Sequence, residues 1–145
     1  MYLLDTNIIS ELRKAPSGKA NQAVIDWAKS VSVSSLFISA VTILELEIGM
    51  LLIERRDPEQ GSILRSWLNI HVLPVFSERI LPFDTAVAQR CAKLHVPDPR
   101  SERDAIIAAT ALVHGMTLVT RSIVDVKSLG VEILNPWEFK KITQS

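Results

Sequence analysis

Four acidic residues stand at points where the chain is expected to enter or leave regular secondary structure. Asp5 follows directly after an apolar run at the start of the chain, and Asp125 lies shortly after a second such run. Glu45 and Asp104 fall within the first turns of two predicted helices. In open α/β sheets, ligands bind beyond the carboxyl ends of the strands. If the two helices begin at that same edge, the four carboxylates converge there.

Carboxylates gathered in a partly buried site repel one another unless a cation holds them. Their hard oxygen atoms suit Mg²⁺ or Mn²⁺. The sequence has one cysteine and three scattered histidines, so it offers no Cys/His set for zinc. The four acids therefore predict a site for Mg²⁺ or Mn²⁺.

Each acid also has a simpler structural role open to it. Asp5 can form an Asx-turn and cap the following helix. The segment "TILE", which ends at Glu45, fits a capping box, and "SERD", which ends at Asp104, nearly fits another. Asp125 can be a solvated loop acid. Glu47 lies two residues from Glu45 and cannot point the same way along a helix, so we assign Glu47 to the solvent side.

Apolar runs alternate with segments of helical periodicity along the whole chain. Strands are expected at residues 2–4, 36–40, 79–83, 116–120 and 130–134. Helices are expected at residues 8–13, 20–31, 42–54, 63–70, 85–94 and 101–114. Asp84 is expected to cap one helix and Gly115 to end another.

Two polar segments complete this assignment: "RRDPEQG" (55–61) reads as a turn and "VPDPR" (96–100) as a stiff loop. Strands that alternate with helices predict an α/β fold with a mainly parallel central sheet flanked by helices. At 145 residues the chain fits one domain, residues 1–145.

The composition is that of an ordinary soluble globular protein, with 48% hydrophobic and 22% charged residues. A formal net charge of zero provides no electrostatic footprint for nucleic acid. A lone cysteine, Cys91, excludes an internal disulfide and fits the reducing cytoplasm, where we expect the protein to act. Asp5 interrupts the N-terminal apolar stretch, which therefore does not resemble a signal peptide. The apolar run 43–53 contains two glutamates and is too short for a membrane span.

Four motifs, taken in order, carry a resemblance to a known family. They are "LLDTNIIS" at the start, "TILELEIG" at 42–49, "DAIIAATALVHGMTLVTR" at 104–121 and "NPWE" near the end. Together they resemble the PIN-domain toxins of the VapC/FitB type, and the resemblance runs nearly end to end. It implies a PIN-like domain and the activity of that family, a metal-dependent endoribonuclease that acts as the toxin of a toxin–antitoxin module.

The resemblance also implies roles for individual residues. Asp5, Glu45 and Asp104 match the three core acids of the family, and Asn7 matches the polar residue that helps to hold the first of them. Asp5 and Asp104 would bind the metal directly, whereas Glu45 would bind it through water or act as a base. Asp125 would complete the shell. Carboxylate-held Mg²⁺ can make a water nucleophilic and neutralise the charge that develops when a phosphodiester is hydrolysed.

The loop after the "MTLVT" strand departs from the family pattern at two positions. That pattern is commonly Thr-Arg-Asn-x-x-Asp-Phe, and here Ser122 replaces the Asn and Val126 replaces the aromatic residue. Thr120 or Ser122 could hydrogen-bond a phosphate or a metal-bound water, and each could equally fill an ordinary turn role. Small alanines in the 101–114 helix let it lie close to the sheet, which brings Asp104 near the strand ends.

The resemblance implies three kinds of partner. These are a structured RNA substrate such as tRNA, a cognate antitoxin protein, and a second copy of the chain in a homodimer. An arginine of the antitoxin could enter the acidic site, because its guanidinium matches carboxylates. The apolar faces around Trp27 and the 42–54 helix are candidate docking surfaces. No membrane partner is expected.

Two other functions remain open at this point. A PIN-fold protein with weak catalysis could act mainly by binding its partner, and the two loop departures are the support for it. A phosphotransfer enzyme with Asp5 as nucleophile is a further alternative. The common phosphatase pattern has a second Asp two residues later, where this chain has Asn7.

Overall fold

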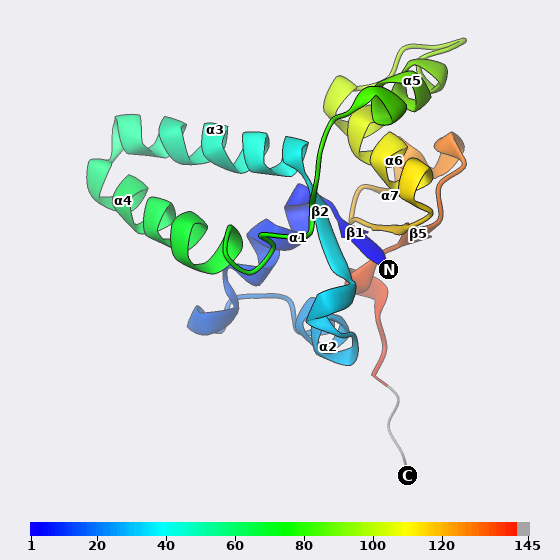
Figure 1. The fold of residues 1–145 in the computed structure, drawn as a ribbon. Helices are drawn as coiled ribbons and strands as arrows, with labels where there is room; N and C mark the ends of the chain where they lie inside the picture. The colour runs from blue at the N-terminus through cyan, green and yellow to red at the C-terminus, as the bar shows by residue number, and fades with distance from the viewer. Residues whose placement is uncertain (142–145) are drawn as a thin grey trace.

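The computed structural model describes residues 1–141, and a five-stranded parallel sheet runs through its centre (Figure 1). The strand order is β3-β2-β1-β4-β5, so the first strand of the chain is the middle strand of the sheet. This confirms the predicted parallel α/β architecture. The strands are β1 (Tyr2–Leu4), β2 (Leu36–Ser39), β3 (Ile80–Leu81), β4 (Thr117–Val119) and β5 (Ile133–Leu134).

Parallel pairing brings the carboxyl ends of the strands to one edge of the sheet. Leu3 of β1 lies opposite Phe37 of β2 on one side and opposite Leu118 of β4 on the other. The backbone N–H of Asp5 donates to the carbonyl of Val119 at 2.9 Å, which extends this pairing beyond the end of β1. The residues that follow β1 and β4 are therefore neighbours in space.

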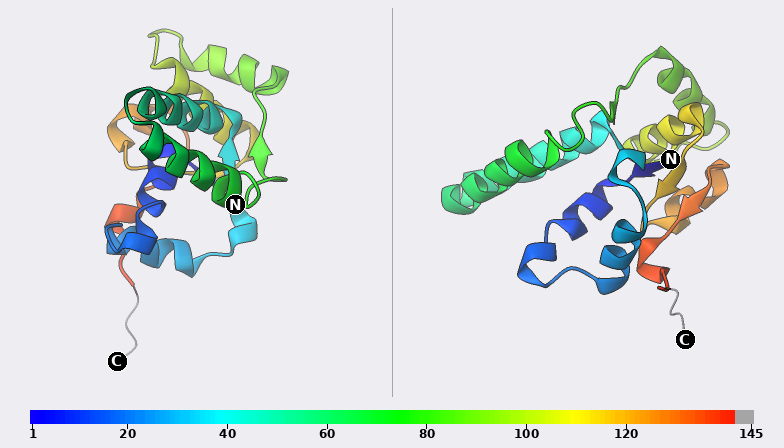
Figure 2. Two further views of the ribbon diagram at one scale, coloured as in Figure 1. Left: turned by 90° about the vertical axis from the view of Figure 1, so that its left-hand side faces the viewer. Right: turned by 60° about the horizontal axis from the view of Figure 1, so that its bottom comes forward.

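The helices cover both faces of the sheet, as the two views in Figure 2 show. Helices α5 and α6 pack against each other, whereas α3 and α4 form a hairpin that extends away from the sheet (Figures 1 and 2). The helices are α1 (Thr6–Leu12), α2 (Gln22–Ser30), α3 (Ala40–Arg56), α4 (Pro58–Trp67), α5 (Thr85–Leu94), α6 (Glu102–His114) and α7 (Ile123–Val126). Short helical turns are η1 (Ala15–Ser17), η2 (Val33–Ser35), η3 (Leu68–Val72), η4 (Lys127–Leu129) and η5 (Pro136–Glu138).

Two apolar clusters hold these layers together, one on each face of the sheet. The first joins Leu3 and Leu118 of the sheet to α6 and α7, and the second joins Leu4 and Ile38 to α1, α2 and η3. Four alanines of α6 are fully buried, so this helix approaches its neighbours closely, as the sequence predicts. These alanines are Ala105, Ala108, Ala109 and Ala111.

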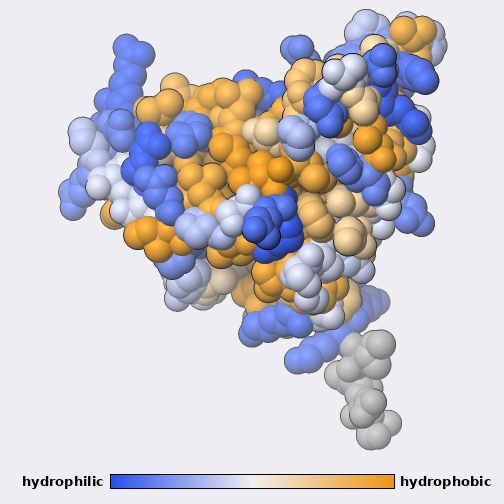
Figure 3. Space-filling model, in the orientation of Figure 1, coloured by the Kyte–Doolittle hydropathy of each residue, from blue (hydrophilic) through white to orange (hydrophobic). Residues whose placement is uncertain are grey.

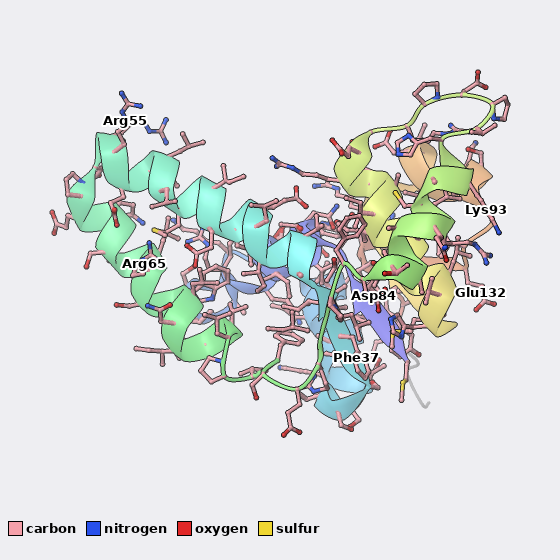
Figure 4. The ribbon with its side chains drawn as sticks, turned by 45° about the horizontal axis from the view of Figure 1, so that its top comes forward. Phe37, Arg55, Arg65, Asp84, Lys93 and Glu132 are labelled. Atoms are coloured by element: carbon pink, nitrogen blue, oxygen red, sulfur yellow. The ribbon has the colours of Figure 1, made fainter. Side chains whose placement is uncertain are left out.

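Helix caps at several predicted positions have the expected geometry. Asp84 accepts a hydrogen bond from the backbone N–H of Val87 at 3.0 Å and caps α5 (Figure 4). Gly115 follows α6 with a φ of 64°, a left-handed conformation that glycine adopts without a steric penalty.

The predicted polar turn at 55–61 is wrong. Helix α3 continues to Arg56 and α4 begins at Pro58, so Asp57 alone separates them. Proline is favoured in the first turn of a helix, and the Asp57 side chain accepts the backbone N–H of Gln60 at 3.2 Å. One residue thus ends a helix and caps the next.

The α3–α4 hairpin is held by a close approach and an ion pair. A Cβ atom on Gly61 of α4 would lie only 2.5 Å from the Cα atom of Glu54 in α3. Arg65 of α4, labelled in Figure 4, lies 3.1 Å from a carboxylate oxygen of Glu47. The Glu47 side chain keeps 32% of its surface exposed, in line with its assignment to the solvent side, but it is half-buried and its carboxylate pairs with Arg65.

Of the two candidate docking surfaces, the one around Trp27 is buried and the one on α3 is exposed. Trp27 is only 2% exposed and packs edge-on against Tyr2 with ring centroids 5.3 Å apart, so it belongs to the core. Helix α3 exposes Leu44, Leu51 and Leu52, and hydrophobic residues are visible over the hairpin in Figure 3. No helix within residues 1–141 combines the length and hydropathy that crossing a membrane requires.

Gly61→Ala should destabilise the protein by about 1–3 kcal/mol, because the added methyl group overlaps the backbone of α3. Gly49→Ala in α3 is the matched control. Nothing lies within 4 Å of its added Cβ, so the better helix former should stabilise the protein by about 0.5–1 kcal/mol. Urea denaturation of both variants measures these changes. Equal stability of the two would contradict the close approach of α3 and α4.

Candidate active site

A polar cleft of about 470 Å³ lies at the carboxyl edge of the sheet. Helix α1, the starts of α3 and α6, the segment after β4 and the turn η5 contribute its walls. Three of the four predicted site acids line it, together with several hydroxyl, amide and basic side chains. The lining residues are Asp5, Thr6, Asn7, Ser10, Glu11, Lys14, Glu45, Asp104, Arg121, Ser122 and Trp137.

Asp5 is a buried acid of the cleft, with 9% of its surface exposed. One carboxylate oxygen accepts the backbone N–H of Thr6 at 2.7 Å, and the other accepts the hydroxyl of the buried Thr120 at 2.7 Å. Burial raises the pKa of Asp5, and repulsion from Asp104 and Asp125 adds to this effect. The two hydrogen bonds oppose the rise in pKa without cancelling it. Asp5 also caps α1, so its predicted structural role and its position in the cleft coexist.

Asn7 joins the ends of the two central strands from the side of α1. Its amide nitrogen lies 3.5 Å from Asp5, 3.4 Å from the Thr120 hydroxyl and 3.4 Å from the Ser122 hydroxyl. Its carbonyl oxygen accepts the backbone N–H of Arg121 at 3.4 Å. The three predicted supporting residues thus surround the first acid.

Glu45 reaches the cleft from the second turn of α3. The helix begins at Ala40 and is capped by Ser39, so the capping-box alternative for Glu45 is wrong. Its carboxylate accepts the hydroxyl of Thr6 at 2.9 Å and lies 4.0 Å from the guanidinium of Arg103. Burial raises the pKa of Glu45, and repulsion from Asp5 contributes to the rise.

Asp104 enters the cleft from the first turn of α6, where burial raises its pKa and repulsion from Asp125 raises it further. Asp125 stands on the short helix α7, is exposed, and is not among the lining residues. Its charge nevertheless acts on both Asp5 and Asp104. The structure therefore brings three acids together and leaves the fourth beside them.

The donor atoms of this site are oxygens, the kind that Mg²⁺ and Mn²⁺ prefer. Three acids with raised pKa values gain when a cation offsets their mutual repulsion. Within residues 1–141, however, no three histidine, cysteine or acidic side chains are grouped so that they could hold a metal ion between them. The chemistry of the site thus fits a hard cation bound by fewer than three direct carboxylates.

Comparisons with known proteins agree with this geometry. The PIN domain family matches residues 2–122. VapC ribonuclease Y4jK of Sinorhizobium fredii is 35% identical over 143 residues, which cover 95% of this chain and 99% of that protein. The chain is a PIN-domain protein of the VapC/FitB type.

Toxin FitB of Neisseria gonorrhoeae is 37% identical to this PIN protein over 144 residues, covering 94% of this chain and 99% of the toxin. The crystal structure of FitAcB from the same organism contains a similar chain, with a TM-score of 0.86 and 33% identity. That match covers 96% of this chain and all of the other. The resemblance that the motifs indicated is confirmed.

Several residues of this PIN-domain cleft are absent from the sequence-based site. Thr6 holds Glu45, Arg103 approaches Glu45, and Arg121 stacks on Trp137. The sequence does carry a signal for Thr6 and Arg121. Each is the second residue after a central strand, β1 for Thr6 and β4 for Arg121. The loop departure at Val126 has a structural role, because this side chain is buried in the core beneath α7.

Asp5→Asn should raise the thermal midpoint of the protein in EDTA at neutral pH, because it removes a charge that is disfavoured first by burial and then by repulsion from its acidic neighbours. A carboxyl with a raised pKa binds more protons when folded. The wild-type protein should therefore lose stability as the pH rises from about 4 toward neutrality. Over the same pH range the Asp5→Asn variant should lose less stability than the wild-type protein. The exposed Glu78→Gln is the control. Parallel stability curves for wild type and Asp5→Asn would contradict the raised pKa of Asp5.

Proposed function

We propose that this protein is the toxin of a type II toxin–antitoxin module and acts as a Mg²⁺-dependent endoribonuclease that hydrolyses RNA phosphodiester bonds. The observation that carries the proposal is the convergence of Asp5, Glu45 and Asp104, all with raised pKa values, on one cleft at the sheet edge. The names of the relatives, a VapC ribonuclease and the toxin FitB, support the reaction class and the biological role.

Asp5 and Asp104 are the proposed direct ligands of the metal. Asp5 is held in a fixed orientation by the Thr6 N–H and the Thr120 hydroxyl, which leaves its remaining lone pairs for a cation. Asp104 lines the same cleft from the first turn of α6. Asp125 is the proposed outer acid, which adds negative charge and acts through water.

Glu45 is the proposed base, or a ligand that acts through water. Its raised pKa makes it a better proton acceptor than an exposed glutamate. Thr6 orients it through the 2.9 Å hydrogen bond to one oxygen, while the other oxygen lies 4.0 Å from the Arg103 guanidinium, beyond hydrogen-bond distance, and would accept from an attacking water. Asn7, Thr120 and Ser122 keep the strand ends in register around these acids.

Mg²⁺ usually binds through one or two carboxylates and keeps several waters, which agrees with the spacing of the acids here. When bound, such an ion lowers the pKa of a coordinated water and offsets the negative charge on the phosphate. Mn²⁺ has the same oxygen preference and should substitute for it.

A cognate antitoxin is the proposed inhibitor. An antitoxin arginine that enters the cleft would pair with Asp5 or Asp104 and compete with the metal and the substrate. The exposed leucines of α3 offer an apolar surface next to the cleft, since the same helix contributes Glu45. We also propose a homodimer and a structured RNA substrate such as tRNA.

Asp5→Asn and Asp104→Asn should each lower the rate of RNA cleavage at least about a hundredfold, because each removes a charge that holds the metal. Both proteins should remain folded by circular dichroism and should no longer arrest growth when expressed. Cleavage of RNA by the purified proteins measures the effect. Growth arrest by a well-expressed Asp104→Asn protein would refute its assignment.

Glu45→Gln and Glu47→Gln form a matched pair within this experiment. Both remove a negative charge from α3, but Glu45 lines the cleft and Glu47 pairs with Arg65 outside it. We expect a large loss of cleavage for Glu45→Gln and nearly normal cleavage for Glu47→Gln. A comparable loss for both would mean that the wrong glutamate is assigned.

Mg²⁺ or Mn²⁺ should raise the thermal midpoint, because a ligand that binds the folded form stabilises it by mass action. The gain is about 2.7 kcal/mol when the free ion is at a hundred times its dissociation constant. Differential scanning fluorimetry with and without EDTA measures this rise. The rise should shrink in Asp5→Asn. An equal rise in wild type and variant would place the metal elsewhere in the protein.

A further inference from the structure

Arg121 and Trp137 form a pair on the wall of the cleft that the proposed chemistry does not use. The guanidinium carbon of Arg121 lies over the indole ring, 4.9 Å from its centroid, and both side chains line the same cleft as Asp5 and Asp104. The distance and position are those of a cation–π contact. Arg121 comes from the segment after β4, and Trp137 comes from the turn η5.

Both partners of this pair are anchored in the fold. The backbone N–H of Arg121 donates to Asn7, which also approaches Asp5. The backbone N–H of Trp137 is held by the side chain of Asn135 at 3.0 Å, and the indole packs against the apolar cluster around β1. The backbone of Arg121 and the indole of Trp137 are therefore held by the fold, and the guanidinium is located by its contact with the indole.

Arg121 is not paired with a carboxylate among the residues that the structure describes. Of the basic side chains that line the cleft, Lys14 forms an ion pair with Glu11 at 3.4 Å. Arg121 forms no ion pair within 4.0 Å in the part of the chain that the structure describes, and its side chain is exposed. An aromatic ring thus keeps this cation apart from the acids while leaving its donors open to a ligand.

We propose that Arg121, supported by Trp137, binds a phosphate of the RNA strand next to the bond that is cut. A guanidinium offers a planar fork of donors that matches phosphate oxygens, and stacking on an aromatic ring limits its rotamer freedom. This inference rests on the proposed nuclease function and assigns a positioning residue for the substrate. It also provides a local cation for nucleic acid in a chain with no net charge.

The test compares Arg121→Ala, Arg121→Lys and the exposed Arg55→Ala, whose position at the far end of the α3–α4 hairpin appears in Figure 4. Labelled total tRNA, which belongs to the proposed class of structured substrates, is the probe. Arg121→Ala should raise KM roughly tenfold and leave kcat nearly unchanged, because the contact forms equally in the ground and transition states. Arg121→Lys should recover part of the loss, and Arg55→Ala should match wild type.

Binding measured in an Asp5→Asn background, which does not cut the probe, isolates the contact from catalysis. Loss of one phosphate contact should reduce the slope of log Kd against log salt by about 0.7 where the phosphate lies in a single-stranded loop and by about 0.9 where it lies in a duplex. Trp137→Phe, which keeps a ring, should weaken binding less than Arg121→Ala. The thermal midpoint of Arg121→Ala should stay near that of wild type, since the side chain is exposed.

Each outcome separates the inference from the proposed function. Cleavage by wild type with an unchanged KM and salt slope in Arg121→Ala would overturn the role of Arg121 and leave the nuclease intact. A fall in kcat without a rise in KM would overturn it as well. Wild-type protein that neither binds nor cuts the probe would overturn both.

Discussion

The hydrogen bond between the Thr120 hydroxyl and the Asp5 carboxylate joins the ends of the two central strands, and the geometry of the cleft depends on it. It is possible because β1 and β4 pair in parallel and end at the same edge. Glu45 is located relative to this point, since α1 leads from Asp5 and supplies the Thr6 hydroxyl to Glu45. A change in strand register would move all of these contacts together.

Gathering acids in this way costs stability that the rest of the fold must supply. Asp5, Glu45 and Asp104 all have a raised pKa, mainly because burial penalises their charged forms. The two apolar clusters on either side of the sheet offset this cost. Such local strain is common at functional sites, where activity requires an arrangement that stability alone does not favour.

Much of this fold was predictable because its signals are local. Apolar runs located all five strands, and the caps at Asp84 and Gly115 are chemical features of single residues. The turn predicted at 55–61 is wrong because Asp57 both ends α3 and caps α4. The composition of this segment does not distinguish such a junction from a loop. The start of α3 was assigned two residues late, and this error made a capping box plausible at Glu45.

Three of the four acids predicted from the sequence line the cleft, whereas the contacts around them were not predictable. The order of the strands, and hence the meeting of Asp5 with Thr120, depends on pairing between segments more than a hundred residues apart. Arg121 and Trp137 come from different segments of the chain, and neither residue type alone indicates that one lies over the other. These contacts depend on packing between segments that are distant in the sequence. Such packing produces no periodic pattern of residues from which it could be predicted.

The α3–α4 hairpin determines which glutamate faces the acids. Glu45 and Glu47 are two positions apart, about 200° around a helix, so a half-turn of α3 would exchange them. Gly61 lets α4 approach α3 on one side only, and Arg65 of α4 engages Glu47 there. Packing against α4 therefore fixes the rotation of α3 about its own axis. The orientation of the cleft glutamate is thus maintained by the contacts between α4 and Glu47 as well as by its own hydrogen bond from Thr6.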